Sequence, residues 1–159
     1  IDKITREKII KDYSSELIIP GLKGSIRGKA FNLLVKNYLE EIYSLDKDYE
    51  LTFEKNHSFY TTSQVPDWYL EYKPLNKVII GMNQVDLWKG GAQRVRGSYY
   101  LKQSSKNCKN YKFVCVIANY TEIKTEESYV YKIFNLGFQC KTLCYLNNLK
   151  HIINSFLAQ

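Results

Sequence analysis

Residues 65–85 read VPDWYLEYKPLNKVIIGMNQV, and this stretch decides the fold. Aromatic and β-branched residues fill both of its halves, and Lys73-Pro74-Leu75-Asn76 separates them. Proline and asparagine between two such runs predict a β-hairpin. We therefore expect strands over residues 65–72 and 77–85, joined by a tight turn.

Helical periodicity precedes the hairpin. From Ser25, apolar side chains recur with spacings of three and four residues, which predicts an amphipathic helix of about four turns. The apolar positions are Phe31, Leu34, Val35, Tyr38, Leu39 and Ile42. Upstream we expect a short helix over residues 5–13 and a turn at Ile18-Ile19-Pro20-Gly21. Between the amphipathic helix and the hairpin, residues 49–54 alternate as a strand does.

The segments after the hairpin supply the rest of an α/β fold. We expect a helix over residues 92–103 interrupted at Gly97, a buried central strand over 111–118, and an extended segment over 120–135. A short strand over residues 142–146 and a final amphipathic helix over 149–157 complete the chain. This order predicts a mixed β-sheet flanked by helices on both faces.

The composition is that of one globular domain, which we assign to residues 1–159 with a core over about 25–157. The chain has 45% hydrophobic residues, including 14 Tyr, 7 Phe and 2 Trp, too much buriable surface for a disordered segment. No apolar run approaches the roughly 20 residues that cross a bilayer, and no signal peptide is visible. We therefore expect no membrane association.

The excess of basic residues is concentrated in one segment. The formal net charge is +7, and the segment from Asp86 to Phe113 holds seven Lys or Arg against one acid, a local charge of +6. Such a concentration predicts a surface that attracts a polyanion. For residues 102–112 alone, a solvated lysine-rich loop is the alternative.

The four cysteines show no metal-binding or disulfide pattern. They form no C-x-x-C pair, and the two histidines stand at no ligand spacing from them. Cys115 and Cys144 lie within apolar runs, where a free thiol acts as a small buried hydrophobe. Structural cysteines fit a reducing, intracellular compartment, the cytoplasm or a nucleus.

The string Pro66-Asp67-Trp68-Tyr69-Leu70-Glu71-Tyr72-Lys73 carries the candidate chemistry. It places two acids on one predicted strand and a lysine directly after it. Hydrolysis of a phosphodiester adds negative charge to an anion, which a hard divalent cation held by carboxylates stabilises. A nearby ammonium group offsets developing charge on the attacking water.

With its preceding helix and strand, this string resembles the PD-(D/E)xK nuclease superfamily, the restriction-endonuclease-like fold, whose core runs helix, three strands, helix, strand. The resemblance implies one or two magnesium ions held by Asp67 and Glu71, with Lys73 at the attacking water. Members often carry an acid on the first helix after an opening similar to Gly28-Lys29-Ala30-Phe31; here Asn32 follows.

The pairing of the catalytic acids has more than one solution. On one strand Asp67 and Glu71 are about 13 Å apart, farther than two ligands of one ion. Across the hairpin, Asp67 is expected opposite residues 82–84 and Glu71 opposite residues 78–80. Gln84 or Asn83 then orients the water in place of lysine, and the second carboxylate comes from Glu71, Glu54 or Asp86.

The next segment adds a candidate nucleic-acid contact. Gly90-Gly91 allows close approach of a phosphate, and the following helix begins with free amides. Its basic and polar residues can bind phosphate oxygens. The candidates are Lys89, Gln93, Arg94 and Arg96. The alternative is a glycine turn before a solvated basic helix.

We therefore predict a magnesium-dependent DNA endonuclease similar to a type II restriction enzyme. Cleavage of both strands favours a homodimer, because a twofold protein matches a twofold duplex. One alternative is a non-catalytic nucleic-acid-binding domain of the same fold. Another is a nuclease-like module of a larger complex that uses this surface for protein contacts.

Overall fold

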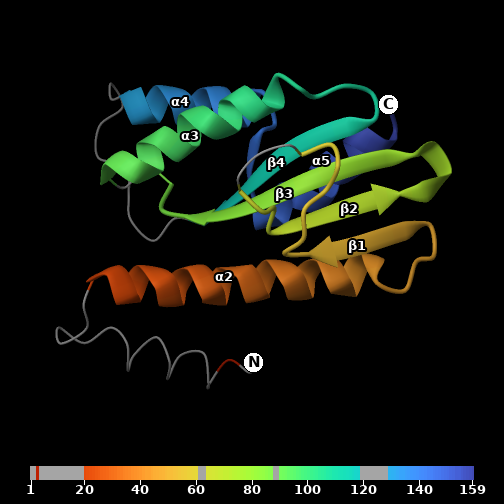
Figure 1. Ribbon diagram of the computed structural model, residues 1–159, viewed down its shortest axis with the longest axis horizontal. Helices are drawn as coiled ribbons and strands as arrows, with labels where there is room; N and C mark the ends of the chain where they lie inside the picture. Colours follow the sequence, from red (N-terminus) through yellow and green to blue (C-terminus); the bar gives the residue numbers. More distant parts are fainter. Residues whose placement is uncertain (1–2, 4–19, 61–63, 88–89, 119–128) are drawn as a thin grey trace.

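The computed structural model describes residue 3 and residues 20–60, 64–87, 90–118 and 129–159 (Figure 1). For residues 20–25, 90–95 and 129–130 it describes the backbone alone. The elements, in chain order, are α2 (Pro20–Tyr43), β1 (Tyr49–Phe53), β2 (Trp68–Tyr72), the 3-10 turn η1 (Lys73–Leu75), β3 (Lys77–Val85), α3 (Gly90–Ser104), β4 (Tyr111–Ala118), α4 (Tyr129–Gln139), β5 (Leu143–Tyr145) and α5 (Leu146–Leu157).

One mixed sheet forms the centre of the molecule, with strand order β1-β2-β3-β4-β5. β2 runs antiparallel to both of its neighbours, β1 and β3, whereas β4 and β5 run parallel to β3. Helices α3 and α4 cover one face, and α2 lies on the other (Figure 1). Buried residues of α5 join the α2 side of the core. The predicted α/β architecture, a mixed sheet between helices on both faces, is therefore confirmed.

The hairpin that joins β2 to β3 forms as its sequence predicts. Tyr72 pairs with Lys77, and Asn76 closes the turn with a left-handed φ of 50°. Asparagine tolerates this conformation better than most residues with a side chain. β3 begins and ends at the predicted residues, while β2 begins at Trp68, three residues later than expected.

A close contact between β2 and β3 requires a glycine at position 81. Trp68 pairs with Gly81, and the Trp68 indole lies directly over the Gly81 backbone. A Cβ atom at residue 81 would lie 1.9 Å from Trp68 Cε2. The indole is 1% exposed, so it has no free direction in which to move.

Three sequence predictions are wrong. Pro20 and Gly21 open α2 instead of forming a turn, in keeping with the preference of proline for the first turn of a helix. Gly97 does not interrupt α3, because it is buried against Ile133 of α4. Residues 129–135, part of the segment 120–135 that was predicted to be extended, belong to the helix α4, and the rest of that segment lies outside the described residues. The predicted helix over residues 5–13 lies outside the described residues.

Lys77 is buried although it carries a charge. Its ammonium group donates hydrogen bonds of 2.9 Å to two carbonyl oxygens, that of Phe156 in the last turn of α5 and that of Gln159 beyond the helix. The same group lies 5.0 Å from the centre of the Phe156 ring. Lys77 thus joins the start of β3 to the C-terminal turn of α5, where helix carbonyls lack backbone partners.

The cysteines divide into two buried and two exposed thiols, all free. Cys115 and Cys144 lie in the core, as the sequence predicted, and Cys108 and Cys140 are exposed. Burial raises the pKa of the Cys144 thiol to about 12 and that of Cys115 well above its usual range. Among the described helices, none is both long and apolar enough to cross a membrane.

Candidate functional site

A pocket of about 240 Å³ lies between α2 and the sheet, at the end of β1, the start of β2 and near the end of β3. One wall comes from α2 and the other from the sheet. The lining residues are Lys29, Asn32, Leu33 and Lys36 of α2, and Phe53, Glu54, Asp67 and Asn83 of the sheet side. The pocket therefore combines two carboxylates, two side-chain amides and two ammonium groups.

Asp67 is held by the antiparallel ladder just before β2 begins. Its amide donates to the Gly81 carbonyl at 3.1 Å, and its Oδ2 accepts a 2.6 Å hydrogen bond from the Asn83 amide. Burial raises the pKa of the Asp67 carboxyl; the hydrogen bond from Asn83 opposes this shift, and the charge of Glu54 adds to it. The carboxylate is positioned but incompletely compensated, which favours binding of a cation or a proton.

Glu54 supplies the second carboxylate. It directly follows β1, which pairs with β2 on the side away from β3. Its backbone has a left-handed φ of 53°, uncommon for a residue with a Cβ, directly after β1. The Glu54 amide donates to the Asp67 carbonyl at 3.1 Å, which links the two acidic residues. Of the alternatives that the sequence left open for the second acid, Glu54 is the one that lines the pocket with Asp67.

A hydrogen-bonded network forms the floor of the pocket. Asn83 Oδ1 accepts from Trp68 Nε1 at 3.1 Å, and Asn83 Nδ2 donates to Asn32 Oδ1 at 3.2 Å. Asn83 is 8% exposed and uses both its acceptor and its donor, so the orientation of its amide is determined. Asn32, on the turn of α2 where the resemblance implies an acid, thus contacts β3.

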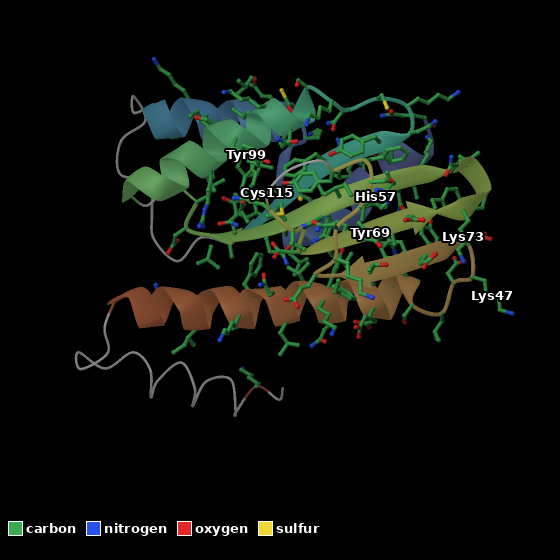
Figure 2. All side chains as sticks on the ribbon, viewed as in Figure 1. Lys47, His57, Tyr69, Lys73, Tyr99 and Cys115 are labelled. Atoms are coloured by element: carbon green, nitrogen blue, oxygen red, sulfur yellow. The ribbon has the colours of Figure 1, made fainter. Side chains whose placement is uncertain are left out.

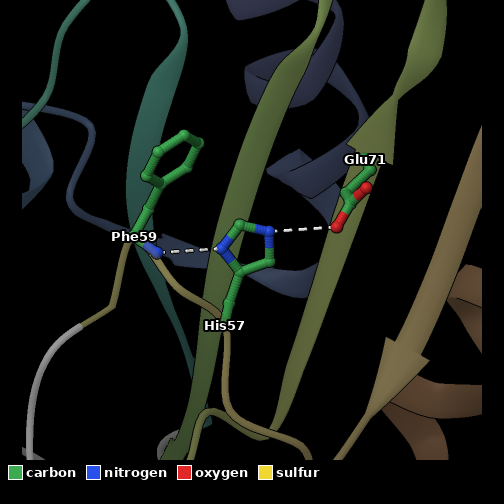
Figure 3. Close-up of polar contacts among 3 residues, drawn as sticks. All are labelled: His57, Phe59 and Glu71. Atoms are coloured by element: carbon green, nitrogen blue, oxygen red, sulfur yellow. Dashed lines mark hydrogen bonds and ion pairs between the residues drawn. The ribbon is translucent and has the colours of Figure 1, made fainter.

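The structure does not bring Glu71 to Asp67. Glu71 pairs in register with Val78, whereas Asp67 contacts Gly81 and Asn83, so the two acids lie about 13 Å apart along the sheet. Glu71 instead contacts His57, with 3.0 Å between Glu71 Oε1 and His57 Nε2 (Figure 3). Glu71 is therefore not placed to share a metal ion with Asp67.

The His57 ring is fixed from both sides. Its Nδ1 accepts a 3.1 Å hydrogen bond from the Phe59 amide, so the neutral ring carries its proton on Nε2 and donates it to Glu71 (Figure 3). Tyr69 contacts the ring edge-on, with 4.8 Å between ring centres. His57 thereby anchors the segment after β1 to the middle of β2.

Lys73 lies at the opposite end of the hairpin from Asp67. It is the first residue of η1, is exposed, and donates its backbone amide to the Asp48 carbonyl at 2.8 Å. Figure 2 shows it at the turn end of the sheet, near Lys47. Six residues of nearly extended chain separate it from Asp67, about 20 Å, so the two are not brought together.

Gln84 lies beside the pocket but does not line it. It follows Asn83 in β3, so its side chain points to the other face of the sheet. There Gln84 Oε1 accepts a 3.2 Å hydrogen bond from Arg96 of α3. Asp86, just beyond β3, is buried and does not line the pocket either.

The remaining basic candidates are only partly described. Gln93 and Arg94 belong to α3, whose backbone alone is described there, and Lys89 lies outside the described residues. Arg96 is exposed and contacts Gln84, at the same end of β3 as Asn83. The contact places Arg96 near the pocket but on the other face of the sheet.

The lysine-rich part of the basic segment lies far from Asp67. β4 is parallel to β3, and Tyr111 pairs with Val78, so the loop before β4 lies at the hairpin end of the sheet. α3, with 15 residues, spans about 22 Å between the two ends. The exposed lysines of this part of the basic segment are Lys102, Lys106 and Lys109. These lysines follow β3 closely in the sequence, yet in the structure they lie at the end of the sheet away from the pocket.

Lys29 and Lys36 are the pocket residues to which sequence reasoning assigned no role. Their signal is a second stripe on α2, because Lys29, Asn32, Leu33 and Lys36 follow spacings of three and four residues. The apolar stripe of the same helix dominated the periodicity, and the sequence analysis did not treat the second stripe as a surface of its own.

Comparisons with protein-family models, with curated proteins and with solved structures find no match for this chain. The arrangement of the pocket therefore carries the functional argument. Among the residues that the structure describes, no three His, Cys, Asp or Glu side chains gather as a metal-binding group. The pocket offers two carboxylates, with amide oxygens beside them.

Proposed function

We propose that the chain is a magnesium-dependent endonuclease that hydrolyses phosphodiester bonds of DNA in this pocket. The observation that supports the proposal is the convergence of Asp67 and Glu54, from neighbouring strands, opposite two lysines of α2. The element order from α2 to β4, helix, three strands, helix, strand, is also the order that the resemblance implies.

The donor set fits a magnesium ion. Magnesium prefers hard oxygen ligands and commonly takes one or two carboxylates from the protein, the remaining ligands being water and substrate phosphate. Asp67 and Glu54 would hold the ion, and neutralising this pair relieves the unfavourable burial of the Asp67 charge. A bound ion would supply Lewis-acid stabilisation of the phosphoryl oxygens and a more acidic water.

The chain's own residues orient this chemistry. The backbone amide of Asn83 donates to the Asp67 carboxylate at 2.6 Å and positions it. The side chains of Trp68, Asn83 and Asn32 form the network that keeps the floor rigid. No lysine follows Asn83 on β3, so Lys73 is replaced in this proposal by the ammonium groups of α2. Cleavage of both strands requires two such pockets, which a homodimer would supply.

A plasmid-nicking assay with and without magnesium tests the proposal. Asp67→Asn and Glu54→Gln remove charge with little change of shape, and each is expected to lower cleavage at least about 100-fold. Glu71→Gln is the matched control, because its amide oxygen can still accept from His57, and it is expected to cleave like the natural chain.

The outcomes separate the possible sites. Unchanged cleavage by Asp67→Asn refutes the pocket as the active site. Loss of cleavage in Glu71→Gln but not in Glu54→Gln assigns the second carboxylate to Glu71. Light scattering with and without a DNA duplex tests the homodimer, and an RNA duplex in the same assay tests the preference for DNA.

One observation favours a second function, a non-catalytic nucleic-acid-binding domain. Asn83 occupies the strand on which the resemblance implies an acid, and its side-chain amide accepts from Trp68 and donates to Asn32 in the floor network. Salt-sensitive DNA binding with no magnesium-dependent cleavage would support this second function and refute the first.

A further inference from the structure

The helix α2 presents two different stripes to the rest of the molecule. Phe31, Val35, Leu39 and Tyr43 pack into the core against the sheet. The residues that line the pocket lie on a neighbouring stripe, at positions 29, 32, 33 and 36. One helix thus completes the core and also forms one wall of the pocket.

The two walls of the pocket carry opposite charge. The sheet side carries Asp67 and Glu54, and the helix side carries Lys29 and Lys36, so the formal charge of the lining is zero. A divalent cation alone is attracted by one wall and repelled by the other, and an anion alone meets the reverse. A cation together with a phosphate satisfies both walls.

Lys36 lies close to the acidic wall, where it contacts the Phe53 ring and forms an exposed ion pair with Glu40. Its Nζ lies 5.1 Å from the centre of the Phe53 ring, next to Glu54, and 3.9 Å from Glu40 Oε1. The Lys36 and Glu40 side chains are 47% and 44% exposed, and an exposed ion pair of this kind contributes little to stability. A phosphate oxygen can therefore replace Glu40 as the partner of Lys36.

Lys29 lies two turns earlier, about 10 Å along the helix axis from Lys36, with Asn32 between them. Asn32 is tied to Asn83 on β3, so this part of α2 keeps a constant distance from the acidic wall. The two ammonium groups therefore span a length suited to successive groups of one polyanionic strand, and a single small anion would contact only one.

We propose that Lys29 and Lys36 bind phosphate oxygens of the nucleic-acid strand, so that the strand and the divalent cation bind to this pocket cooperatively. The inference rests on the proposed function, because it takes a metal–phosphodiester pair as the occupant. It assigns backbone binding to α2, on the opposite face of the sheet from Arg96.

In the double variant Lys29→Gln/Lys36→Gln, the inference predicts tighter metal binding by the free protein and no further strengthening by nucleic acid. Removing two ammonium groups from the wall that faces the ion should raise the affinity of the free protein for a divalent ion several-fold, after screening by salt. The same change removes the partners of the phosphates, so added nucleic acid should no longer strengthen metal binding.

Manganese titration followed by electron paramagnetic resonance measures these affinities on the full chain. The nucleic acids are a DNA and an RNA duplex with phosphorothioate linkages, which keep their charge and resist hydrolysis. Lys47→Gln is the matched control, since Lys47 is exposed in the turn before β1, at the hairpin end of the sheet (Figure 2). Asp67→Asn checks that the titration reports this pocket, because it should weaken manganese binding with and without duplex.

For the natural chain and Lys47→Gln, we expect DNA to raise manganese affinity at least about tenfold. For the double variant, we expect DNA to leave manganese affinity unchanged. An unchanged affinity and an unchanged DNA effect in the double variant overturn the inference. The same response in Lys47→Gln also overturns it, because the effect would then be a general one of net charge. An RNA effect equal to that of DNA supports recognition of the shared backbone.

The proposed function and this inference can fail separately. Cooperative binding without cleavage in the plasmid assay refutes the nuclease and leaves the anion site standing. Magnesium-dependent cleavage that is unaffected in the double variant refutes the anion site and leaves the nuclease standing.

Discussion

Gly81→Ala should destabilise the protein far more than one added methyl group suggests. The new Cβ would lie 1.9, 2.2 and 2.4 Å from three atoms of the Trp68 indole, well inside van der Waals contact. The indole cannot yield easily, because it is 1% exposed and donates its Nε1 proton to Asn83. The substitution therefore affects the core and the pocket floor together.

The expected cost follows from three contributions. Overpacking a core costs about 1–3 kcal/mol, and losing the Trp68–Asn83 hydrogen bond leaves buried polar groups unpaired at about 1–3 kcal/mol. Replacing glycine by alanine in a strand returns about 0.5–1 kcal/mol of chain entropy. The net loss is about 3 kcal/mol, which for a domain of this size lowers the melting temperature by roughly 6–12 °C.

Urea unfolding followed by tryptophan fluorescence measures this loss, and Gly28→Ala is the control. A Cβ at Gly28 meets nothing within 4 Å, and Gly28 lies inside α2, so alanine there should stabilise by about 0.5–1 kcal/mol. In a Trp68→Leu background, Gly81→Ala should cost less than about 1 kcal/mol. Equal unfolding midpoints for Gly81→Ala and the natural chain would refute the reasoning.

Three further predictions concern titration, thiol reactivity and the loop after β1. Burial raises the pKa of Asp67 above 3.8, so the folded chain holds that proton more tightly than the unfolded chain, and stability falls as the pH rises from 3.8 through the raised pKa. Asn does not titrate, so Asp67→Asn does not lose this stability. Urea unfolding at a series of pH values should therefore show its free energy of unfolding rising relative to that of the natural chain across this window, and a constant difference contradicts the prediction. A thiol reagent should modify the two exposed cysteines in the native chain and the two buried ones only after unfolding, and rapid native reaction of all four contradicts the burial. His57→Phe keeps a ring against Tyr69 but removes both hydrogen bonds of Figure 3, so it should speed hydrogen exchange of the Phe59 amide and cost about 1–2 kcal/mol, whereas unchanged exchange contradicts the anchor.

Much of the fold could be predicted from local patterns. β3 and β4 were predicted to the residue, because near-continuous apolar runs bounded by turn residues occur where both faces of a strand are buried. α4 was missed because aromatic and β-branched residues have strand propensity, and its burial against α3 and the sheet overrides that preference. Lys77, a charged residue, is buried because its partners come from the distant C-terminal turn.

The candidate site was predictable only in part. Asp67 was found because Pro-Asp stands before an aromatic strand in a recognisable order of elements. Glu71 and Lys73 were assigned from proximity along one strand, yet an extended strand carries residues four and six positions away beyond the reach of one ion. Glu54 and the lysines of α2 line the pocket with Asp67 instead, and this depends on which elements become neighbours.

The sequence by itself determined the α/β class, the hairpin, most strands and Asp67, because hydrophobic periodicity and turn chemistry act over a few residues. Only the tertiary structure decided which charges share the pocket. β1 pairs beside β2 and brings Glu54 to Asp67, while α2 crosses the strand ends and brings Lys29 and Lys36 opposite them. Such contacts join residues 13 to 38 positions apart, and the packing of the elements sets them.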